Sequence, residues 1–295
     1  MRILVTGATG FIGGSFARLA AASGHKIAAL IRPGKAPPTI AGDVSWHAGT
    51  LAEAPWPEIA AFRAEVCVHA AWITTPGVYL DSPENETLMQ WSRDFIRRAA
   101  QTGVRRVVSL GTCLEYQISG SVLTESTTPL LPTFLYARCK DALRRSLEED
   151  SAQYAFTLCW GRVFYPYGPG EHPARLCSAL AQKLIRGERV VLKTPDSTKD
   201  YIFIDDLAAA LLAVVEHEFS GAVNLGTGLG VTVRCVAETI EEILGRSGLI
   251  GIAEAAQPDP LAHVVADISR LCGLGWSPRV SLRQGLSQLV QHPTP

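Results

Sequence analysis

The sequence predicts an α/β protein, with a doubly wound parallel sheet followed by a smaller, discontinuous C-terminal α/β domain. Two observations lead to this prediction. Short, continuous apolar segments of strand length recur along the first half of the chain, and a segment with helical spacing of its apolar residues follows most of them. Strands that are apolar on both sides indicate a parallel sheet whose two faces are covered by helices.

The predicted elements of the first half alternate between strand and helix. The first apolar segment ends at Gly7, and the helix after it stops before Gly24, a residue that favours a helix C-terminus. The expected strands cover residues 3–5, 27–31, 66–70, 106–110 and 155–160, and the expected helices cover residues 11–22, 88–101 and 136–149.

This alternation changes after about residue 161, where a loop rich in Pro and Gly begins. A second, smaller domain is therefore expected, interrupted by a return of the chain to the first sheet. The elements expected here are a loop at 165–173, a helix that ends at Ile185, strands at 190–192 and 202–204, and helices at 205–216 and 233–244. We expect a larger domain at 1–162, with 201–226 returning to it, and a smaller domain at 163–200 and 227–295.

Composition and charge exclude several classes of protein. The chain has 295 residues, 47% of them hydrophobic and 19% charged, which is typical of a folded globular protein. With 27 Lys and Arg against 28 Asp and Glu, it lacks the basic field of a nucleic-acid-binding protein. Its seven Cys show no CxxC or Cys/His spacing, so we expect neither a metal site nor a disulfide framework.

The sequence predicts neither a membrane span nor a secretory leader. The chain begins MRILVTG, which leads directly into a strand, and its longest apolar run, residues 207–215, is far shorter than a bilayer span. We therefore expect a soluble, cytoplasmic protein.

The turn between the first strand and the first helix contains Gly7, Gly10 and Gly13, in the segment VTGATGFIGG. A dinucleotide site of the Rossmann type needs glycine for a tight turn, for close approach of the backbone to a pyrophosphate, and for tight helix packing. The pyrophosphate then accepts hydrogen bonds from free N–H groups at the helix N-terminus. The spacing and position of these glycines predict an NAD(P) cofactor.

The end of the second strand indicates which of the two cofactors is bound. A carboxylate there binds the ribose hydroxyls of NAD, whereas an Arg accommodates the 2′-phosphate of NADP. Here the strand ends Leu30-Ile31-Arg32 and offers no Asp or Glu. We expect Arg32 to bind the phosphate, so NADP(H) is favoured and NAD(H) is the alternative.

Tyr136 and Lys140 are four residues apart on a predicted helix, and so lie on one face of it. A nearby Lys charge favours tyrosinate and is expected to lower the Tyr pKa from about 10. Such a Tyr can protonate a ketone oxygen as hydride arrives. Thr112 follows the strand at 106–110, at the edge where open α/β sheets expose catalytic groups, so its hydroxyl could bind the same oxygen.

These residues resemble the extended short-chain dehydrogenase/reductase family of NDP-sugar epimerases, dehydratases and ketoreductases. The resemblance runs through essentially the whole chain and places Thr112, Tyr136 and Lys140 in the catalytic positions. The similar segments are VTGATGFIGG, CVHAAW, SLGTCLEY, LYARCK, WGRVFYPYGPGE, DYIFIDD, VNLGTG and the closing Leu274-Gly275-Trp276-Ser277-Pro278.

The resemblance implies further contacts to the cofactor and to a nucleotide-diphosphate sugar, the latter bound by the smaller domain. Besides the residues already named, those expected to bind the cofactor are Thr9, Phe11, Ile12, Thr50, Leu51, Ala70, Ala71, Trp72 and Val163, and those expected to bind the substrate are Tyr165, Arg175 and Lys199.

The departures from the family pattern separate the possible reactions. Cys113 and Leu114 stand where similar 4,6-dehydratases have Asp and Glu, which excludes water elimination. Arg32 stands where similar 4-epimerases have an acid for tightly bound NAD. Tyr165 replaces the usual Asn of RxFN, and Lys199 replaces an Arg, which keeps the charge but not the bidentate fork.

Four functions fit these residues to different degrees. We favour an NADPH-dependent ketoreductase acting on a nucleotide-activated keto-deoxysugar; an NAD-dependent 4-epimerase is the alternative. A non-catalytic NADP sensor is disfavoured because the Tyr/Lys pair is intact, and reduction of a non-sugar ketone is disfavoured by the NLGTG segment. Cys113 and His172 resemble the extra bases of an epimerase-reductase, although Cys113 is one residue out of place. Helices 88–101 and 136–149 resemble the family's dimer contact, so we expect a homodimer.

Overall fold

The computed structural model describes residues 1–254 and 259–293. Its centre is a sheet of seven strands, in the order β10-β6-β5-β4-β1-β2-β3, and every neighbouring pair in it is parallel. This confirms the predicted doubly wound α/β class. The strands are β1 (Arg2–Thr6), β2 (Lys26–Ile31), β3 (Val44–Ala48), β4 (Val66–His69), β5 (Arg106–Thr112), β6 (Thr157–Val163) and β10 (Gly221–Leu225).

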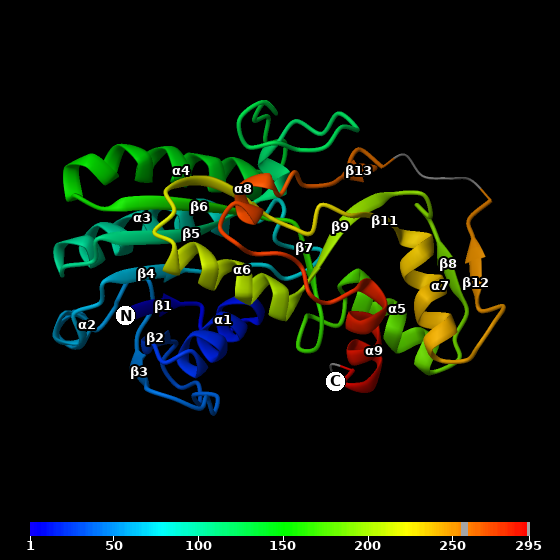
Figure 1. The fold of residues 1–295 in the computed structure, drawn as a ribbon, viewed down its shortest axis with the longest axis horizontal. Coiled ribbons are helices and arrows are strands. Elements are labelled where there is room, and N and C mark those ends of the chain that lie inside the picture. The colour runs from blue at the N-terminus through cyan, green and yellow to red at the C-terminus, as the bar shows by residue number, and fades with distance from the viewer. Residues whose placement is uncertain (255–258, 294–295) are drawn as a thin grey trace.

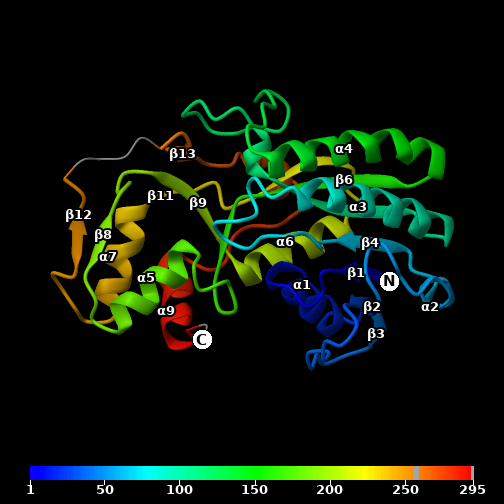
Figure 2. The same cartoon turned by 180° about the vertical axis from the view of Figure 1, so that it is seen from behind.

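Helices cover both faces of this sheet (Figures 1 and 2). The helices α1 and α6 pack side by side on one face, and α3 and α4 pack side by side on the other, with α2 beside them. The turn η1 follows β5 directly. These elements are α1 (Phe11–Ala22), α2 (Trp56–Phe62), α3 (Glu84–Gln101), η1 (Cys113–Glu115), α4 (Leu135–Tyr154) and α6 (Ile204–Glu216).

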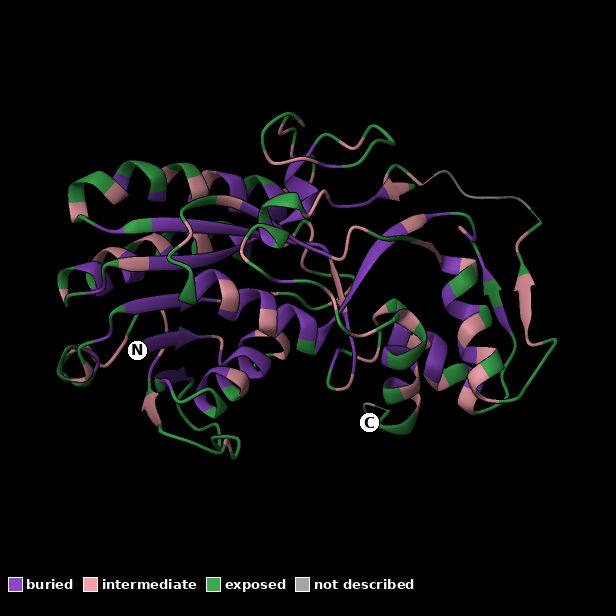
Figure 3. Cartoon of the chain, viewed as in Figure 1, coloured by how far each residue is buried: buried purple, intermediate pink, exposed green. Residues whose placement is uncertain are grey.

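How deeply each strand is buried explains whether it could be predicted from the sequence. The central strands are almost wholly buried between the helix layers, whereas the outward sides of the helices are exposed (Figure 3). Strand β3 lies at the edge of the sheet, and four of its five residues are only half-buried. Its sequence, VSWHA, is therefore not continuously apolar, which is why the sequence analysis missed it.

The smaller part of the molecule is built around β9, which pairs in parallel with β7 and β13 and antiparallel with β11. Strands β8 and β12 form a separate parallel pair, and helices α5, α7 and α9 pack on one another. These elements are β7 (Tyr165–Tyr167), α5 (Leu176–Ile185), β8 (Val190–Leu192), β9 (Thr198–Phe203), β11 (Gly230–Thr232), α7 (Val233–Ile243), β12 (Ile250–Ile252), β13 (His263–Val264), α8 (Ser269–Cys272) and α9 (Leu282–Gln291).

The chain returns to the large sheet as expected, but it does so through α6 and β10 and not through the strand expected at 202–204. Helix α6 packs against α1, and β10 pairs with β6, so both belong to the large sheet. Strand β9, which contains residues 201–203, lies in the smaller sheet instead. The division of the chain at residues 162, 201 and 226 therefore stays a prediction.

Candidate active site

The predicted cofactor turn lies where the large sheet changes direction. The chain runs from β1 outward to β2 and β3, then crosses to β4 on the other side of β1. Ligands of open α/β sheets bind at such a switch point, beyond the carboxyl ends of the strands. The turn that contains Gly7 meets Ala70 and Ala71 there, and Val163 ends β6 at the same edge.

Close backbone contacts require the glycines of this turn. Gly7 has a φ of +71°, and a Cβ atom on it would lie 2.7 Å from backbone atoms of both Ala70 and Ala71. A Cβ on Gly13 would lie 2.4 Å from the Gly7 carbonyl oxygen, and a Cβ on Gly10 would lie 3.2 Å from the same atom. The roles expected of a dinucleotide-binding turn, tight bending and close helix packing, are therefore both present.

The N-terminus of α1 is open beside this turn. Gly10 is its N-cap residue, and no side chain of the described residues caps it. Thr9 and Gly10 are exposed, and Phe11 and Ile12 are half-buried. Because the first N–H groups of a helix lack intrahelical partners and carry partial positive charge, this end of α1 fits the pyrophosphate of an NAD(P) cofactor.

A buried hydrogen-bond chain holds the loop after β4. The Thr6 hydroxyl accepts the Ala71 N–H at 3.3 Å and lies 2.8 Å from His69 Nδ1. The other ring nitrogen of His69 lies 2.9 Å from the Ser92 hydroxyl. Burial, together with the charge of Lys140, lowers the pKa of His69 to about 3, so the ring is neutral and can donate at one nitrogen and accept at the other. His69 is not among the residues predicted from the sequence, although the CVHAAW match contains it.

The loop after β2 carries positive charge. Arg32 and Lys35 are both exposed, and no Asp or Glu occurs between residues 32 and 42. The Thr50 hydroxyl, by contrast, accepts the Glu53 N–H at 3.0 Å, and Leu51 packs against the core beneath α3. Of Arg32, Thr50 and Leu51, which are expected at the adenosine end, Arg32 is the exposed cation.

Tyr136 and Lys140 lie in the first two turns of α4 and are buried, at 8% and 3% exposure. The Lys140 Nζ donates to the Leu110 carbonyl oxygen at 2.8 Å and lies 3.8 Å from the centre of the Trp72 ring. The same Nζ is 5.9 Å from the centre of the Tyr136 ring. Tyr136 packs edge-on against Tyr79, with ring centres 4.9 Å apart. The structure thus brings together Trp72 from the cofactor loop and both members of the predicted pair.

Burial determines the protonation of this pair. Desolvation lowers the pKa of Lys140 from 10.5 to about 7, and the charge of Glu115 opposes this shift. Burial raises the pKa of Tyr136 far above its ordinary value, and Tyr79 and Glu115 add to the rise. The expectation that Lys140 lowers the pKa of Tyr136 is therefore wrong for this structure, because desolvation dominates. A phenol that keeps its proton is suited to donate it to a substrate oxygen.

The lowered pKa of Lys140 predicts a pH dependence of stability. The folded protein loses this proton above about pH 7, whereas the unfolded chain keeps it up to 10.5. The unfolded state therefore binds more protons in this window, and stability rises with pH by at most about 1.4 kcal/mol per pH unit. We expect the free energy of unfolding in urea, taken as wild type minus Lys140→Met, to rise between roughly pH 7 and 9. If this difference in the free energy of unfolding does not change with pH, Lys140 is not a buried lysine that titrates in this range.

Thr112 ends β5 and caps the turn η1. Its hydroxyl accepts the Leu114 N–H at 3.3 Å, and Glu115 Oε1 accepts the Thr112 N–H at 2.8 Å, which together make a capping box. A hydroxyl that accepts one hydrogen bond keeps its proton as a donor. The next residue, Cys113, is buried in the same apolar cluster as Tyr136, so Thr112 lies close to the predicted pair.

Arg175 reaches this pair from the smaller part of the molecule. Its guanidinium donates to the Thr74 carbonyl oxygen at 3.2 Å and lies 5.4 Å from the centre of the Tyr79 ring, which packs on Tyr136. His172 is exposed, and its ring accepts a backbone N–H of its own loop at 3.1 Å. Of these two candidates, Arg175 is the one that the structure connects to Tyr136.

Lys199 and Tyr165 lie together in the smaller sheet. The Lys199 ammonium pairs with the Asp259 carboxylate at 3.1 Å, also donates to the Leu261 carbonyl, and lies 5.8 Å from the centre of the Tyr165 ring. Lys199, the cation expected to bind the substrate, is thus held by the Asp259 carboxylate. The Tyr165 hydroxyl is buried and has no hydrogen-bond partner within residues 1–254 and 259–293, which makes it a candidate ligand contact.

The sequence analysis missed two buried carboxylates near these residues. Glu115, described above, lies in the SLGTCLEY segment, but only Thr112 of that segment was singled out as catalytic. Asp200 accepts both the Thr227 N–H and the Thr227 hydroxyl at 2.7 Å, and so folds the loop of the NLGTG segment. The DYIFIDD match contains Asp200, but the sequence predicts a role only for the neighbouring Lys199.

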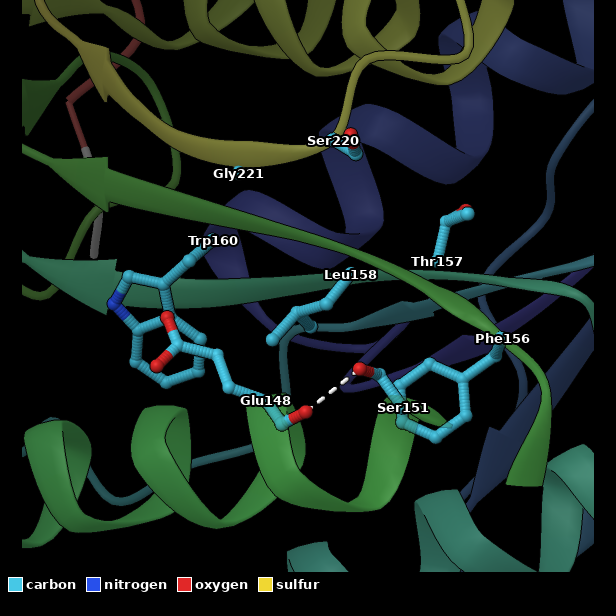
Figure 4. Close-up of a pocket in the computed structure, with 8 residues that line it drawn as sticks. All are labelled: Glu148, Ser151, Phe156, Thr157, Leu158, Trp160, Ser220 and Gly221. Atoms are coloured by element: carbon cyan, nitrogen blue, oxygen red, sulfur yellow. Dashed lines mark hydrogen bonds between the residues drawn. The ribbon is translucent and has the colours of Figure 1, made fainter. Parts of the chain in front are cut away.

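A pocket at the opposite edge of the large sheet does not belong to this site (Figure 4). It lies at the amino ends of β6 and β10, beside α4. The Ser151 hydroxyl donates to the Glu148 carbonyl oxygen at 2.7 Å, and Arg144 donates to the Glu148 carboxylate, so these polar groups are paired. Its lining residues are Glu148, Ser151, Phe156, Thr157, Leu158, Trp160, Ser220 and Gly221.

The described part of the chain offers neither a metal cluster nor a membrane-spanning helix. In residues 1–254 and 259–293, no group of three or more His, Cys, Asp or Glu side chains is arranged to hold a metal ion. The helices found over those residues include none with the length and apolar character to cross a membrane.

Comparison with known proteins assigns this geometry to a family. The model of the NAD dependent epimerase/dehydratase family matches residues 3–226, which is most of the chain. The chain belongs to this family. Membership confirms the resemblance read from the motifs and the prediction of an NAD(P)-dependent enzyme.

Family members named for different reactions are similar to this chain. GDP-L-fucose synthase 1 of Arabidopsis thaliana is 32% identical over 217 residues, which cover 68% of this chain and 67% of that protein. A UDP-glucose 4-epimerase of Halalkalibacterium halodurans is 24% identical over an alignment of 323 positions, covering 99% and 94%. The solved UDP-glucose 4-epimerase of Thermus thermophilus, in complex with NAD, has a TM-score of 0.85 at 25% identity, covering 99% and 98%. The family therefore includes both reaction types considered from the sequence, acting on nucleotide sugars.

Proposed function

We propose that this family member is an NADPH-dependent reductase of a nucleotide-activated 4-keto-deoxysugar. The observation that carries the proposal is the buried pair Tyr136 and Lys140 beside a cofactor turn whose neighbouring strand β2 is followed directly by Arg32 rather than by an acid. The Tyr136 phenol keeps its proton, as a proton donor must. The loop after β2 carries positive charge and no negative charge, which favours NADPH over NAD. An NADPH that exchanges after each turnover suits a net reduction.

Each residue of the site then has a chemical role. When bound, NADPH supplies a hydride for the carbonyl carbon. Thr112 donates a hydrogen bond to the ketone oxygen, and Tyr136 gives that oxygen its proton as negative charge develops. Lys140 stabilises the tyrosinate that remains and holds the nicotinamide ribose. The turn at Gly7 and the N-terminus of α1 would hold the pyrophosphate.

The smaller part of the molecule would bind the nucleotide diphosphate. Arg175 and Lys199 are cations suited to phosphate, and the unpaired Tyr165 hydroxyl could bind the sugar. Lys199 would have to exchange Asp259 for a phosphate oxygen. The domain division and a homodimer through α3 and α4 are part of the same proposal.

An NAD-dependent 4-epimerase is the second candidate, because two relatives described above carry that name. It would retain NAD through purification and interconvert its substrates without net consumption of cofactor. A non-catalytic NADP-sensing protein has less support, since Tyr136 and Lys140 are intact and buried together.

The decisive experiment combines cofactor analysis with a substrate panel. The purified protein is analysed for bound NAD or NADP, then incubated with NADPH and 4-keto-6-deoxysugars carried on GDP, UDP or dTDP. The reductase consumes one NADPH for each hydroxyl formed. Tightly bound NAD together with interconversion of UDP-glucose and UDP-galactose would favour the epimerase.

Arg32 provides a prediction for cofactor choice. Arg32→Ala should raise the KM for NADPH by roughly 10- to 100-fold, because a charge-assisted contact to the 2′-phosphate is lost. The KM for NADH should stay within about twofold, because NADH lacks that phosphate. Steady-state kinetics with both cofactors tests this, and Arg234→Ala, which removes a half-buried Arg paired with the exposed Asp196, is the matched control. An unchanged KM for NADPH would show that Arg32 does not select NADP.

A further inference from the structure

A fully buried carboxylate lies directly behind the candidate catalytic threonine. Glu115 is 0% exposed, its Oε1 accepts the Thr112 N–H at 2.8 Å, and its Oε2 accepts the Arg162 Nε–H at 2.8 Å. The Trp160 indole N–H lies 3.1 and 3.0 Å from the two oxygens. Both oxygens therefore face N–H donors, which is the environment of an ionised carboxylate. Burial raises the pKa of Glu115, and Arg162 with these donors opposes the rise.

The carboxylate is part of a rigid network that spans three strands. Arg162 on β6 also donates to the Tyr116 hydroxyl at 3.1 Å, and that hydroxyl donates to Asn224 Oδ1 on β10 at 2.8 Å. The Asn224 amide donates in turn to the carbonyls of Leu123 and Asp267, at 2.8 and 3.0 Å. A network in which each group has its partner rigidifies the residues that it joins.

Gly111, the residue before Thr112, shows how closely Glu115 packs. A Cβ atom on Gly111 would lie 2.5 Å from Glu115 Oε1 and 2.2 Å from the Trp160 indole nitrogen. The end of β5 can therefore hold a carboxylate and an indole beside it only because this residue is glycine. The position of the Thr112 backbone is thus fixed from two sides, by the Glu115 carboxylate and by β-sheet pairing with β6.

The Glu115 carboxylate also lies near the lysine of the predicted pair. Lys140 Nζ donates to the carbonyl oxygen of Leu110, two residues before the Thr112 N–H that Glu115 accepts, and η1 packs against α4. The titratable groups that interact with Lys140 or share its surroundings are Glu115 from η1, His69 from β4 and Tyr136 from α4. His69 is neutral because its pKa is about 3, and Tyr136 keeps its proton. Of these three groups, Glu115 is the one that carries negative charge near neutral pH. The negative charge that compensates the buried Lys140 ammonium therefore comes from η1, which packs against α4.

We propose that Glu115 is a positioning residue of this active site: it fixes the backbone of Thr112 and supplies the negative charge that keeps Lys140 protonated. The inference rests on the proposed function for the roles of Thr112 and Lys140. Glu115 is not itself a proton donor, because Arg162, Trp160 and the Thr112 N–H already occupy both of its oxygens. It acts through the two residues that it holds.

Glu115→Gln tests this by removing the charge while keeping the shape and one acceptor oxygen. We expect kcat for NADPH-dependent reduction to fall about 10- to 100-fold, with the KM for NADPH within about twofold. Loss of the negative charge lowers the pKa of Lys140, so the protonated, active form disappears at lower pH. The alkaline limb of the kcat/KM profile should move down by about one pH unit. Glu115→Asp keeps the charge and should restore the position of this limb.

Asp150→Asn is the matched control. Asp150 is also buried, at 2% exposure, and accepts hydrogen bonds from Arg93 and Arg97 between α3 and α4, outside the site. It should lower the melting temperature without moving the pH limb. If Glu115→Gln likewise lowers only the melting temperature, and leaves kcat and the limb unchanged, Glu115 is structural and the proposal is wrong.

A measurement without substrate separates this inference from the proposed function. The urea experiment on wild type and Lys140→Met is repeated with Glu115→Gln in both proteins. The pH at which the stability difference begins to rise should fall by about one unit. If the wild type reduces no nucleotide 4-keto-sugar but this shift occurs, the proposed function fails and the electrostatic role of Glu115 stands. The role of Glu115 is overturned if the wild type is active but Glu115→Gln moves neither the pH at which the stability difference begins to rise nor the alkaline limb of the kcat/KM profile.

Discussion

Tyr136→Phe is expected to lower kcat about 100- to 10,000-fold, because it removes the proton donor while keeping the ring. The ring fills a buried position against Tyr79, and Phe preserves that packing. Affinity for NADPH should therefore stay within about twofold, since the pyrophosphate site at Gly7 is untouched. Single-turnover reduction and fluorescence titration with NADPH measure the two quantities separately.

Tyr154→Phe is the control for this substitution. Tyr154 is the last residue of the same helix, α4, and its ring lies 5.7 Å from the Arg97 guanidinium, outside the site. It should leave kcat within about threefold, because the half-buried Tyr154 ring lies outside the site and Phe keeps its packing. If Tyr136→Phe retained the wild-type kcat, the phenol would not be the proton donor. Loss of both turnover and NADPH binding would instead indicate a collapsed site.

The elements that could be predicted from the sequence are those whose apolar residues follow a recognisable pattern, either a continuous run or a helical spacing. Central strands such as β1 and β2 are buried on both faces, so their residues are continuously apolar and easily found. The spacing of Tyr136 and Lys140 likewise follows from the geometry of one helix. Edge strand β3 and the short strand β13 carry no such pattern, because they are half-buried or only two residues long.

The electrostatics of the site could not be predicted in the same way. The pKa of Tyr136 depends on how deeply α4 is buried, which a spacing of four residues does not reveal. Lys199 and Asp259 are 60 residues apart in the chain, and Glu115 and Arg162 are 47 apart. Such pairs arise only when segments that are distant in the chain meet, so a single sequence shows both partners as ordinary charged residues.

Gly7→Ala is expected to abolish cofactor binding, with an NADPH affinity at least about 100-fold weaker and a marked loss of stability. Two separate effects act at this position. The φ of +71° disfavours any residue with a Cβ, at a cost of roughly 1–2 kcal/mol. The new atom would also lie 2.7 Å from the backbone of Ala70 and Ala71, which cannot rotate away as a flexible side chain could. The turn or the loop after β4 must therefore move, and both belong to the candidate cofactor site.

Gly24→Ala isolates the first of these effects. Gly24 has a φ of +84°, similar to that of Gly7, but among the described residues beyond its two chain neighbours no atom lies within 4 Å of a Cβ built on it. It should lose stability by about 1–2 kcal/mol and bind NADPH like the wild type. Urea unfolding and NADPH titration of both variants test the difference. If Gly7→Ala bound NADPH as well as Gly24→Ala does, the close approach of Gly7 to Ala70 and Ala71 would not be what shapes the cofactor site.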